Sequence, residues 1–118
     1  MSINLDNLSE DVKQKILNLQ KLQQTFDFLT TQKLQIDTSL QETELAIEEL
    51  EKTNPEEIVY KSIGGILVRS DRDKLLAEKK SMKTTLEMRS KTLTQKLDRT
   101  KNKIETMRKS LEADLRNQ

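Results

Sequence analysis

The sequence predicts a mainly α protein in which two long antiparallel helices form a coiled coil and are joined by a β-hairpin. Three observations carry this prediction. Charged residues make up 35% of the 118 residues and aromatic residues only 3%, whereas an ordinary globular domain is nearer one quarter charged and half apolar. Two long stretches place apolar residues at coiled-coil spacing. One short run rich in β-branched residues, with the only glycines of the chain, separates them.

The first helix is predicted at about residues 9–52. A heptad register that begins at Leu5 continues to Leu50 without a phase slip, and eleven of its fourteen core positions are apolar. Asp6 or Ser9 is expected to cap its start, and Asn54-Pro55 ends it, because a residue before proline is pushed out of the helical conformation. The core positions are Leu5, Leu8, Val12, Lys15, Leu19, Leu22, Phe26, Leu29, Lys33, Ile36, Leu40, Thr43, Ile47 and Leu50.

The second helix is predicted at about residues 71–116, with Ser70 or Asp71 as its cap. Its apolar register slips once, because Leu86, Leu93 and Leu97 cannot all satisfy a strict alternation of three and four residues that starts at Leu75. We therefore expect a looser seam than in the first helix. The apolar positions are Leu75, Met82, Leu86, Leu93, Leu97, Ile104, Met107, Leu111 and Leu115.

A β-hairpin is predicted at about residues 56–70. Gly64 and Gly65 lie between two β-branched runs, and glycine reaches the positive φ angles that a tight two-residue hairpin turn requires. This turn predicts the cross-strand pairs Ile63–Ile66, Lys61–Val68 and Val59–Ser70.

The hairpin is expected to be the assembly site of an obligate oligomer. An isolated two-stranded sheet is marginal in water, and both of its edges leave backbone groups unpaired. The rest of the chain is committed to the two helices and cannot cover it. Strands from other chains should therefore join it, and the residues expected to form the subunit interface are Ile58, Val59, Tyr60, Ile63, Gly64, Gly65, Ile66, Leu67 and Val68.

The charge of the chain is divided unevenly. Residues 1–59 carry five lysines against twelve carboxylates, and residues 60–118 carry the balancing excess of basic residues. In an antiparallel pair the acidic helix would lie along the basic helix. Binding of nucleic acid is the other interpretation of the basic half, but residues 61–118 contain no aromatic side chain that could stack on bases. We therefore expect no nucleic-acid partner. In the nucleic-acid alternative, the residues that contact phosphate would be Lys79, Lys80, Lys83, Arg99, Lys101 and Lys103.

Catalysis is not expected. Cysteine and histidine are both absent, which excludes disulfides, thiol nucleophiles and imidazole chemistry, and no metal site or cofactor is predicted. Gly64-Gly65 is not followed by the Lys-Ser/Thr pair of a phosphate-binding loop. The longest apolar stretch is too short to cross a membrane, and no secretory signal is visible.

The hairpin segment resembles a known family. The run Val59-Tyr60-Lys61-Ser62-Ile63-Gly64-Gly65-Ile66-Leu67-Val68-Arg69 is similar to the V-Y-K-x-x-G-x-x-L-V/I-K/R segment that joins the two coiled-coil helices of β-class prefoldin subunits. The architecture of nearly the whole chain resembles this class, although only this segment is a sharp motif. The length also fits, because α-class subunits are longer and have two hairpins.

The resemblance implies a fold, a function and partners. The chain would be a single prefoldin-like domain, residues 1–118, in a hexamer of two α-class and four β-class subunits whose hairpins form a β-barrel platform. Its function would be that of an ATP-independent cytoplasmic chaperone, which holds unfolded proteins, prevents their aggregation and delivers them to a group II chaperonin. The alternative is a structural coiled-coil tether without client binding, which leaves the hairpin unexplained.

The resemblance also implies that clients bind at the tips, where the two ends of the chain meet. The ends of a coiled coil fray, so seam residues there can be exposed, and methionine suits a surface that binds many partners because it is flexible and polarizable. The expected client-binding residues are Leu5, Leu8, Val12, Ile16, Leu19, Met107, Leu111 and Leu115.

Overall fold

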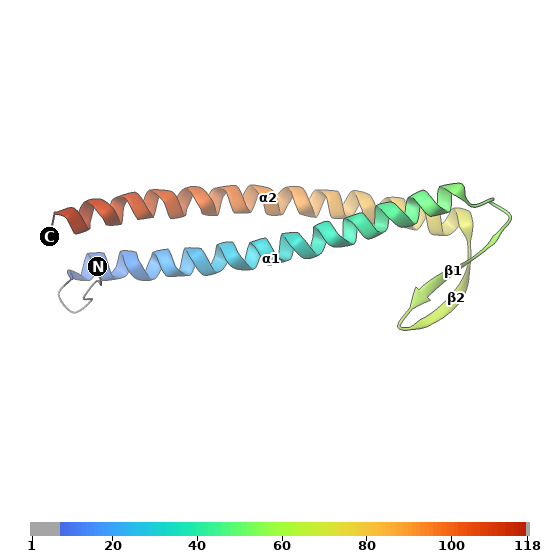
Figure 1. Cartoon of the computed structure of the whole chain (residues 1–118), viewed down its shortest axis with the longest axis horizontal. Coiled ribbons are helices and arrows are strands. Elements are labelled where there is room, and N and C mark those ends of the chain that lie inside the picture. The colour runs from blue at the N-terminus through green and yellow to red at the C-terminus, as the bar shows by residue number, and fades with distance from the viewer. Residues whose placement is uncertain (1–7, 118) are drawn as a thin grey trace. The chain divides into compact units, whose positions relative to one another are not determined.

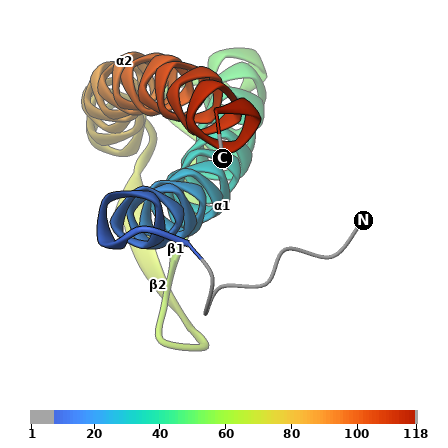
Figure 2. The same ribbon diagram turned by 90° about the vertical axis from the view of Figure 1, so that its left-hand side faces the viewer.

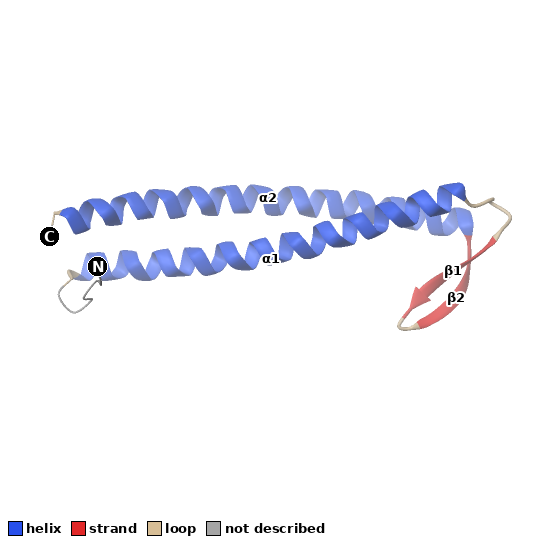
Figure 3. Ribbon diagram, in the orientation of Figure 1, coloured by secondary structure: helices blue, strands red, loops and turns tan. Residues whose placement is uncertain are grey.

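The computed structural model of the chain describes residues 8–117. Four elements follow one another, and Figures 1 and 3 show them: helix α1 (Glu10–Lys52), strand β1 (Ile58–Ile63), strand β2 (Ile66–Asp71) and helix α2 (Arg72–Arg116). The predicted class, two long helices joined by a β-hairpin, is confirmed.

The described residues form two compact units. The terminal unit contains residues 8–32, which include the first part of α1, and residues 93–117, which include the last part of α2. The hairpin unit contains residues 33–92, and therefore the rest of both helices and the two strands. In the terminal unit the segments of α1 and α2 lie side by side, as the end-on view in Figure 2 shows, and their chain directions are opposite.

The seam of α1 follows the predicted heptad register. Every core position of that register from Leu8 to Leu50 is buried or half-buried, whereas Leu5 lies outside the described residues. Burial is complete or nearly so at Val12, Leu29, Thr43, Ile47 and Leu50. Large apolar side chains away from these positions are exposed, among them Phe28 at 63% and Leu45 at 61%. Spacing along the helix thus decides which side chains of α1 reach the seam.

The seam of α2 does not show the predicted slip, because its buried and half-buried residues keep a regular alternation of three and four residues from Lys79 to Asp114. Leu75, Leu86 and Leu93 are buried, but Met82, which the apolar pattern also placed in the seam, is 46% exposed. The half-buried residue on the other side of Leu86 is Ser90, whose hydroxyl donates to Asp37 Oδ1 of α1 at 2.7 Å. A polar contact therefore occupies a seam position at which the apolar pattern has no residue.

A lysine interrupts the seam of α1 in each unit, and each lysine has partners. In the terminal unit Lys15 Nζ donates to Ser110 Oγ at 2.9 Å and pairs with Asp114. In the hairpin unit Lys33 Nζ lies 2.5 Å from Asp37 Oδ2. The hydrogen bond from Lys33, with the one from Ser90, holds the pKa of Asp37 below its usual value. These partners offset the cost of removing an ammonium group from water.

Ion pairs between the helices follow the charge asymmetry only in part. Among the described residues two ion pairs join α1 to α2. Glu51 and Lys80, 3.9 Å apart, have the expected polarity, with the carboxylate on the acidic helix. Lys15 and Asp114 have the reverse polarity. Individual side-chain contacts, rather than the net charge of each half, therefore determine which residues pair.

The hairpin has the register that its turn predicts. Ile63 pairs with Ile66, Lys61 with Val68 and Val59 with Ser70. Gly64 and Gly65 have φ angles of 53° and 84°, as a tight turn with left-handed residues requires. Lys61 Nζ lies 3.0 Å from Glu78 Oε2 of α2, and this hydrogen bond lowers the pKa of Glu78. The contact ties the hairpin to the helix that follows it.

The helix ends are capped by specific side chains. Ser9 Oγ accepts a hydrogen bond from the backbone N–H of Val12 at the start of α1, and Asp71 Oδ1 accepts one from Asp73 at the start of α2; Asp71 rather than Ser70 is therefore the cap. At the end of α1, Arg72 Nε donates to the carbonyl of Leu50 at 2.8 Å and Nη2 to that of Glu51 at 3.3 Å. Arg72 thus joins the end of α1 to the start of α2.

We expect Arg72→Ala to lower the free energy of unfolding by about 1.5–3 kcal/mol, because charge-assisted hydrogen bonds to two helix-end carbonyls are lost. Urea denaturation followed by circular dichroism measures the change. Arg99→Ala is the control, since Arg99 is an exposed arginine of the same helix, and it should change stability by about 0.5 kcal/mol or less. Equal losses in the two variants would contradict the capping role.

Candidate functional site

The hairpin carries an exposed apolar surface on both faces. Six large apolar side chains of β1 and β2 are between 40% and 72% exposed, and no other described element covers them. Soluble monomers rarely leave an apolar patch of this kind in contact with water, unless it binds a partner. The six residues are Ile58, Tyr60, Ile63, Ile66, Leu67 and Val68.

Both edges of the hairpin offer backbone groups to a further strand. The sheet has two strands in the described part of the chain. The pair Ile63–Ile66 closes a two-residue turn and is therefore hydrogen-bonded, and hydrogen-bonded pairs alternate with non-bonded pairs along an antiparallel ladder. The N–H and C=O groups of Tyr60 and Ser62 on β1, and of Leu67 and Arg69 on β2, consequently point outward. A strand from another chain can pair with either edge.

The structure brings the predicted assembly residues together. All of them lie in β1, in β2 or in the turn between the strands. Val59 differs from the others because it is half-buried. The hairpin thus combines apolar side chains and free edges in a segment of fourteen residues, Ile58 to Asp71.

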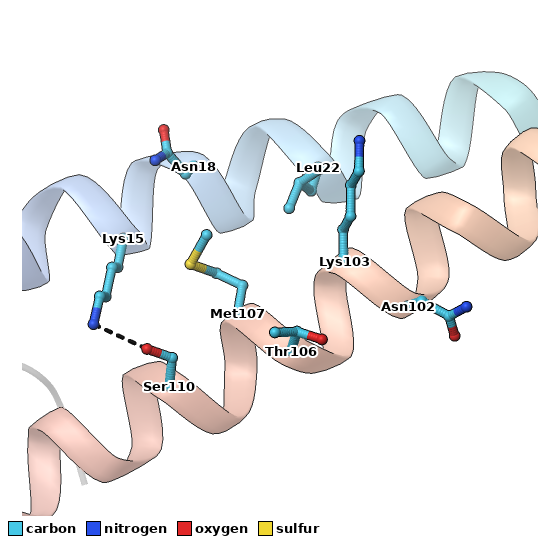
Figure 4. Close-up of a pocket in the computed structure, with 8 residues that line it drawn as sticks. All are labelled: Lys15, Asn18, Leu22, Asn102, Lys103, Thr106, Met107 and Ser110. Atoms are coloured by element: carbon cyan, nitrogen blue, oxygen red, sulfur yellow. Dashed lines mark hydrogen bonds between the residues drawn. The ribbon is translucent and has the colours of Figure 1, made fainter.

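The second candidate site is a cavity in the terminal unit, the Leu22–Met107 cavity, of about 640 Å³. Figure 4 shows that Met107 extends from α2 toward α1, where Leu22 lies, and that Lys15 and Lys103 lie to either side of Met107. The lining is Lys15, Asn18, Leu22, Asn102, Lys103, Thr106, Met107 and Ser110. Its volume is within the range of about 300–1,000 Å³ that is typical of ligand sites.

The predicted client-binding residues within the described chain all belong to the terminal unit. Val12 and Leu111 are buried, at 2% and 9% exposure, and pack in the seam. Leu8, Ile16, Leu19, Met107 and Leu115 are half-buried. Met107 alone among them lines the Leu22–Met107 cavity, and Leu5 lies outside the described residues.

Sequence reasoning missed most of the residues that line this cavity. Leu22 is predicted as a seam position but not as a site residue, and Lys103 is considered only as a phosphate contact. Asn18 and Thr106 carry no signal of their own. The heptad register could have indicated Leu22, because it is the next core position after Leu19. The residues of α2 other than Met107 could not be found in this way, since their position opposite α1 depends on how the two helices are aligned.

The described residues contain no group of three or more acidic, histidine or cysteine side chains that could hold a metal ion. Within the same residues, no helix combines the length and the apolar character of a membrane span.

Comparison with known proteins places these features in a family. The family model described as "Prefoldin subunit" matches residues 13–118. Prefoldin subunit beta of Archaeoglobus fulgidus is 38% identical over 75% of this chain and 77% of that protein. Prefoldin subunit beta of Methanothrix thermoacetophila is 33% identical over 92% of this chain and 90% of that protein.

A solved structure agrees with these relatives. The crystal structure of the prefoldin beta subunit from Thermococcus strain KS-1 superposes with a TM-score of 0.83 at 27% identity, over 93% of this chain and 96% of that chain. Prefoldin subunits are non-enzymatic chaperone subunits, and they form hetero-oligomers with other prefoldin subunits. The chain therefore belongs to the prefoldin family, as a subunit of its beta class.

Proposed function

We propose that this chain holds unfolded polypeptides through the apolar groups of its terminal unit, without nucleotide, and delivers them to a group II chaperonin. The observation that carries the proposal is the Leu22–Met107 cavity, which places apolar side chains of both helices next to solvent in a coiled coil. A tether without clients needs no such space in its seam. The proposed client-binding residues are Leu5, Leu8, Val12, Ile16, Leu19, Met107, Leu111 and Leu115, and Leu22 is added to them.

The hairpin is proposed to build the oligomer. In this proposal the chain acts as one domain, residues 1–118, in a cytoplasmic hexamer of two alpha-class and four beta-class subunits whose hairpins form a β-barrel platform. The exposed apolar side chains and free edges of β1 and β2 support it. The assembly residues are Ile58, Val59, Tyr60, Ile63, Gly64, Gly65, Ile66, Leu67 and Val68.

The test is the fate of a chemically denatured enzyme diluted into buffer at physiological salt with the assembled complex and no nucleotide. We expect light scattering to stay low, because the complex holds the unfolded enzyme, and the enzyme to regain activity when a group II chaperonin and ATP are added. A structural tether would leave aggregation unchanged. Aggregation that proceeds as in buffer alone would refute the holding function, and protection without transfer would refute delivery.

A further inference from the structure

We propose that Lys103 makes the Leu22–Met107 cavity selective for apolar client segments that carry a carboxylate beside their apolar residues. The inference rests on the proposed function, since it concerns which unfolded segments the terminal unit holds. In this inference, the side chain of Lys103 determines whether acidic or basic client segments bind more tightly.

The argument begins with the charges around the cavity. Two of its lining residues are charged, Lys15 and Lys103. Lys15 is compensated, because it pairs with Asp114 and donates to Ser110. Lys103 forms no ion pair with any residue that the structure describes. Among the residues that the structure describes, the lining of the cavity therefore has one positive charge without an ion-pair partner and no carboxylate.

The position of Lys103 suits a role in binding. Figure 4 shows its side chain running from α2 toward α1 beside Leu22, on the side of Met107 opposite to Lys15. Lys103 is exposed, and a lysine beside apolar groups can lay its methylene stem along them while its ammonium group stays in water. An apolar side chain of a client that packs against Leu22 and Met107 would place its neighbouring residues next to that ammonium group.

The neighbouring residues then decide how tightly the segment binds. A carboxylate beside the apolar residues forms an ion pair with Lys103, whereas a lysine or arginine there meets a like charge. The other polar groups of the lining are the neutral side chains of Asn18, Asn102, Thr106 and Ser110, which do not favour either sign of charge. Charge complementarity at Lys103 therefore separates the two kinds of client segment.

The experiment uses the assembled complex and two fluorescently labelled peptides. Both contain the same apolar segment of leucine and serine, flanked on each side by aspartate in one peptide and by lysine in the other. Fluorescence anisotropy measures the two dissociation constants at low and at raised salt. We expect the aspartate peptide to bind about fivefold more tightly at low salt, which corresponds to a partly exposed ion pair, and the difference to shrink as salt screens the charges.

Three variants locate the effect. Lys103→Glu should reverse the order of the two peptides. Lys101→Glu changes the net charge by the same amount at an exposed position of the same helix that does not line the cavity, and it should leave the wild-type preference in place. Met107→Glu should weaken both peptides, because it removes the apolar contact that they share. Circular dichroism of each variant verifies that helix content is retained.

The outcomes distinguish this inference from the proposed function. If both peptides bind the wild type equally well, or if Lys101→Glu reverses their order as fully as Lys103→Glu does, the selectivity is overturned while client binding stands. If neither peptide binds the wild type, the holding function itself is overturned and the selectivity with it. Preference for aspartate that only Lys103→Glu reverses supports the inference.

Discussion

Replacing Ile66 and Leu67 together with aspartate is expected to leave a folded, helical chain that no longer enters the oligomer. These are the most exposed large apolar residues of β2, at 63% and 72%, so their replacement disturbs little within one subunit. In the assembled protein they would be covered by strands of other chains. Each large apolar side chain that is fully buried contributes about 1.5–3 kcal/mol, and a carboxylate that takes its place must lose water without a partner.

The expected size of this effect is large. Loss of two such contacts alone weakens one interface by about 3–6 kcal/mol, which is at least a hundredfold in the dissociation constant. Sedimentation velocity of the beta-class chain mixed with an alpha-class partner measures the assembly mass, and circular dichroism measures the helix content.

The matched control replaces Leu34 and Leu45 together with aspartate. These residues of α1 also belong to the hairpin unit and are similarly exposed, at 67% and 61%, but they lie outside the hairpin. The control variant should keep the mass of the wild-type assembly. If the Ile66/Leu67 variant also kept it, the proposal that the hairpin builds the oligomer would be wrong.

Removal of residues 1–22 and 103–118 is expected to abolish capture of unfolded protein while the oligomer is retained. This truncation deletes all eight predicted client-binding residues together with Leu22 and Lys103. A shorter truncation that removes only residues 1–12 and 108–118 would retain Leu22 and Met107. Part of the cavity that they line would then remain. The hairpin unit, residues 33–92, stays complete, so the mass of the assembly should fall only by the residues removed.

The reason for a complete loss is avidity. Each apolar contact with a mobile client is worth about 1–2 kcal/mol, below the value for full burial. When one client binds several weak contacts on several subunits at once, the overall affinity is much higher than that of any single contact. When every subunit loses its contacts at once, binding falls far more than the loss of a single contact predicts.

The measurement is light scattering of a denatured enzyme with intact and truncated complexes at equal concentration. Two full-length variants are measured in the same way. Met107→Glu should reduce protection. Met88→Glu changes a methionine of the same helix that is 67% exposed in the hairpin unit, and it should leave protection unchanged. Equal protection by the intact and truncated complexes would place the client surface outside the terminal unit.

The seam of α1, the class of fold and the register of the hairpin could all be predicted from the order of the residues. Burial on a single helix depends only on the spacing of its residues, so the heptad positions from Leu8 to Leu50 could be named in advance. The pairs Ile63–Ile66 and Lys61–Val68 follow from the two-residue turn at Gly64 and Gly65, because turn length sets hairpin register.

The side chains of α1 and α2 that contact each other could not be predicted in this way. Lys15 donates to Ser110 and pairs with Asp114, and Asp37 accepts a hydrogen bond from Ser90, because the alignment of α2 against α1 places these residues opposite one another. The net charges of the two halves predicted carboxylates on α1 and basic residues on α2, which is the reverse of the Lys15–Asp114 pair. Lys103 and Met107 border the same cavity as Leu22 for the same reason: the spacing along one helix carries no information on its alignment with another.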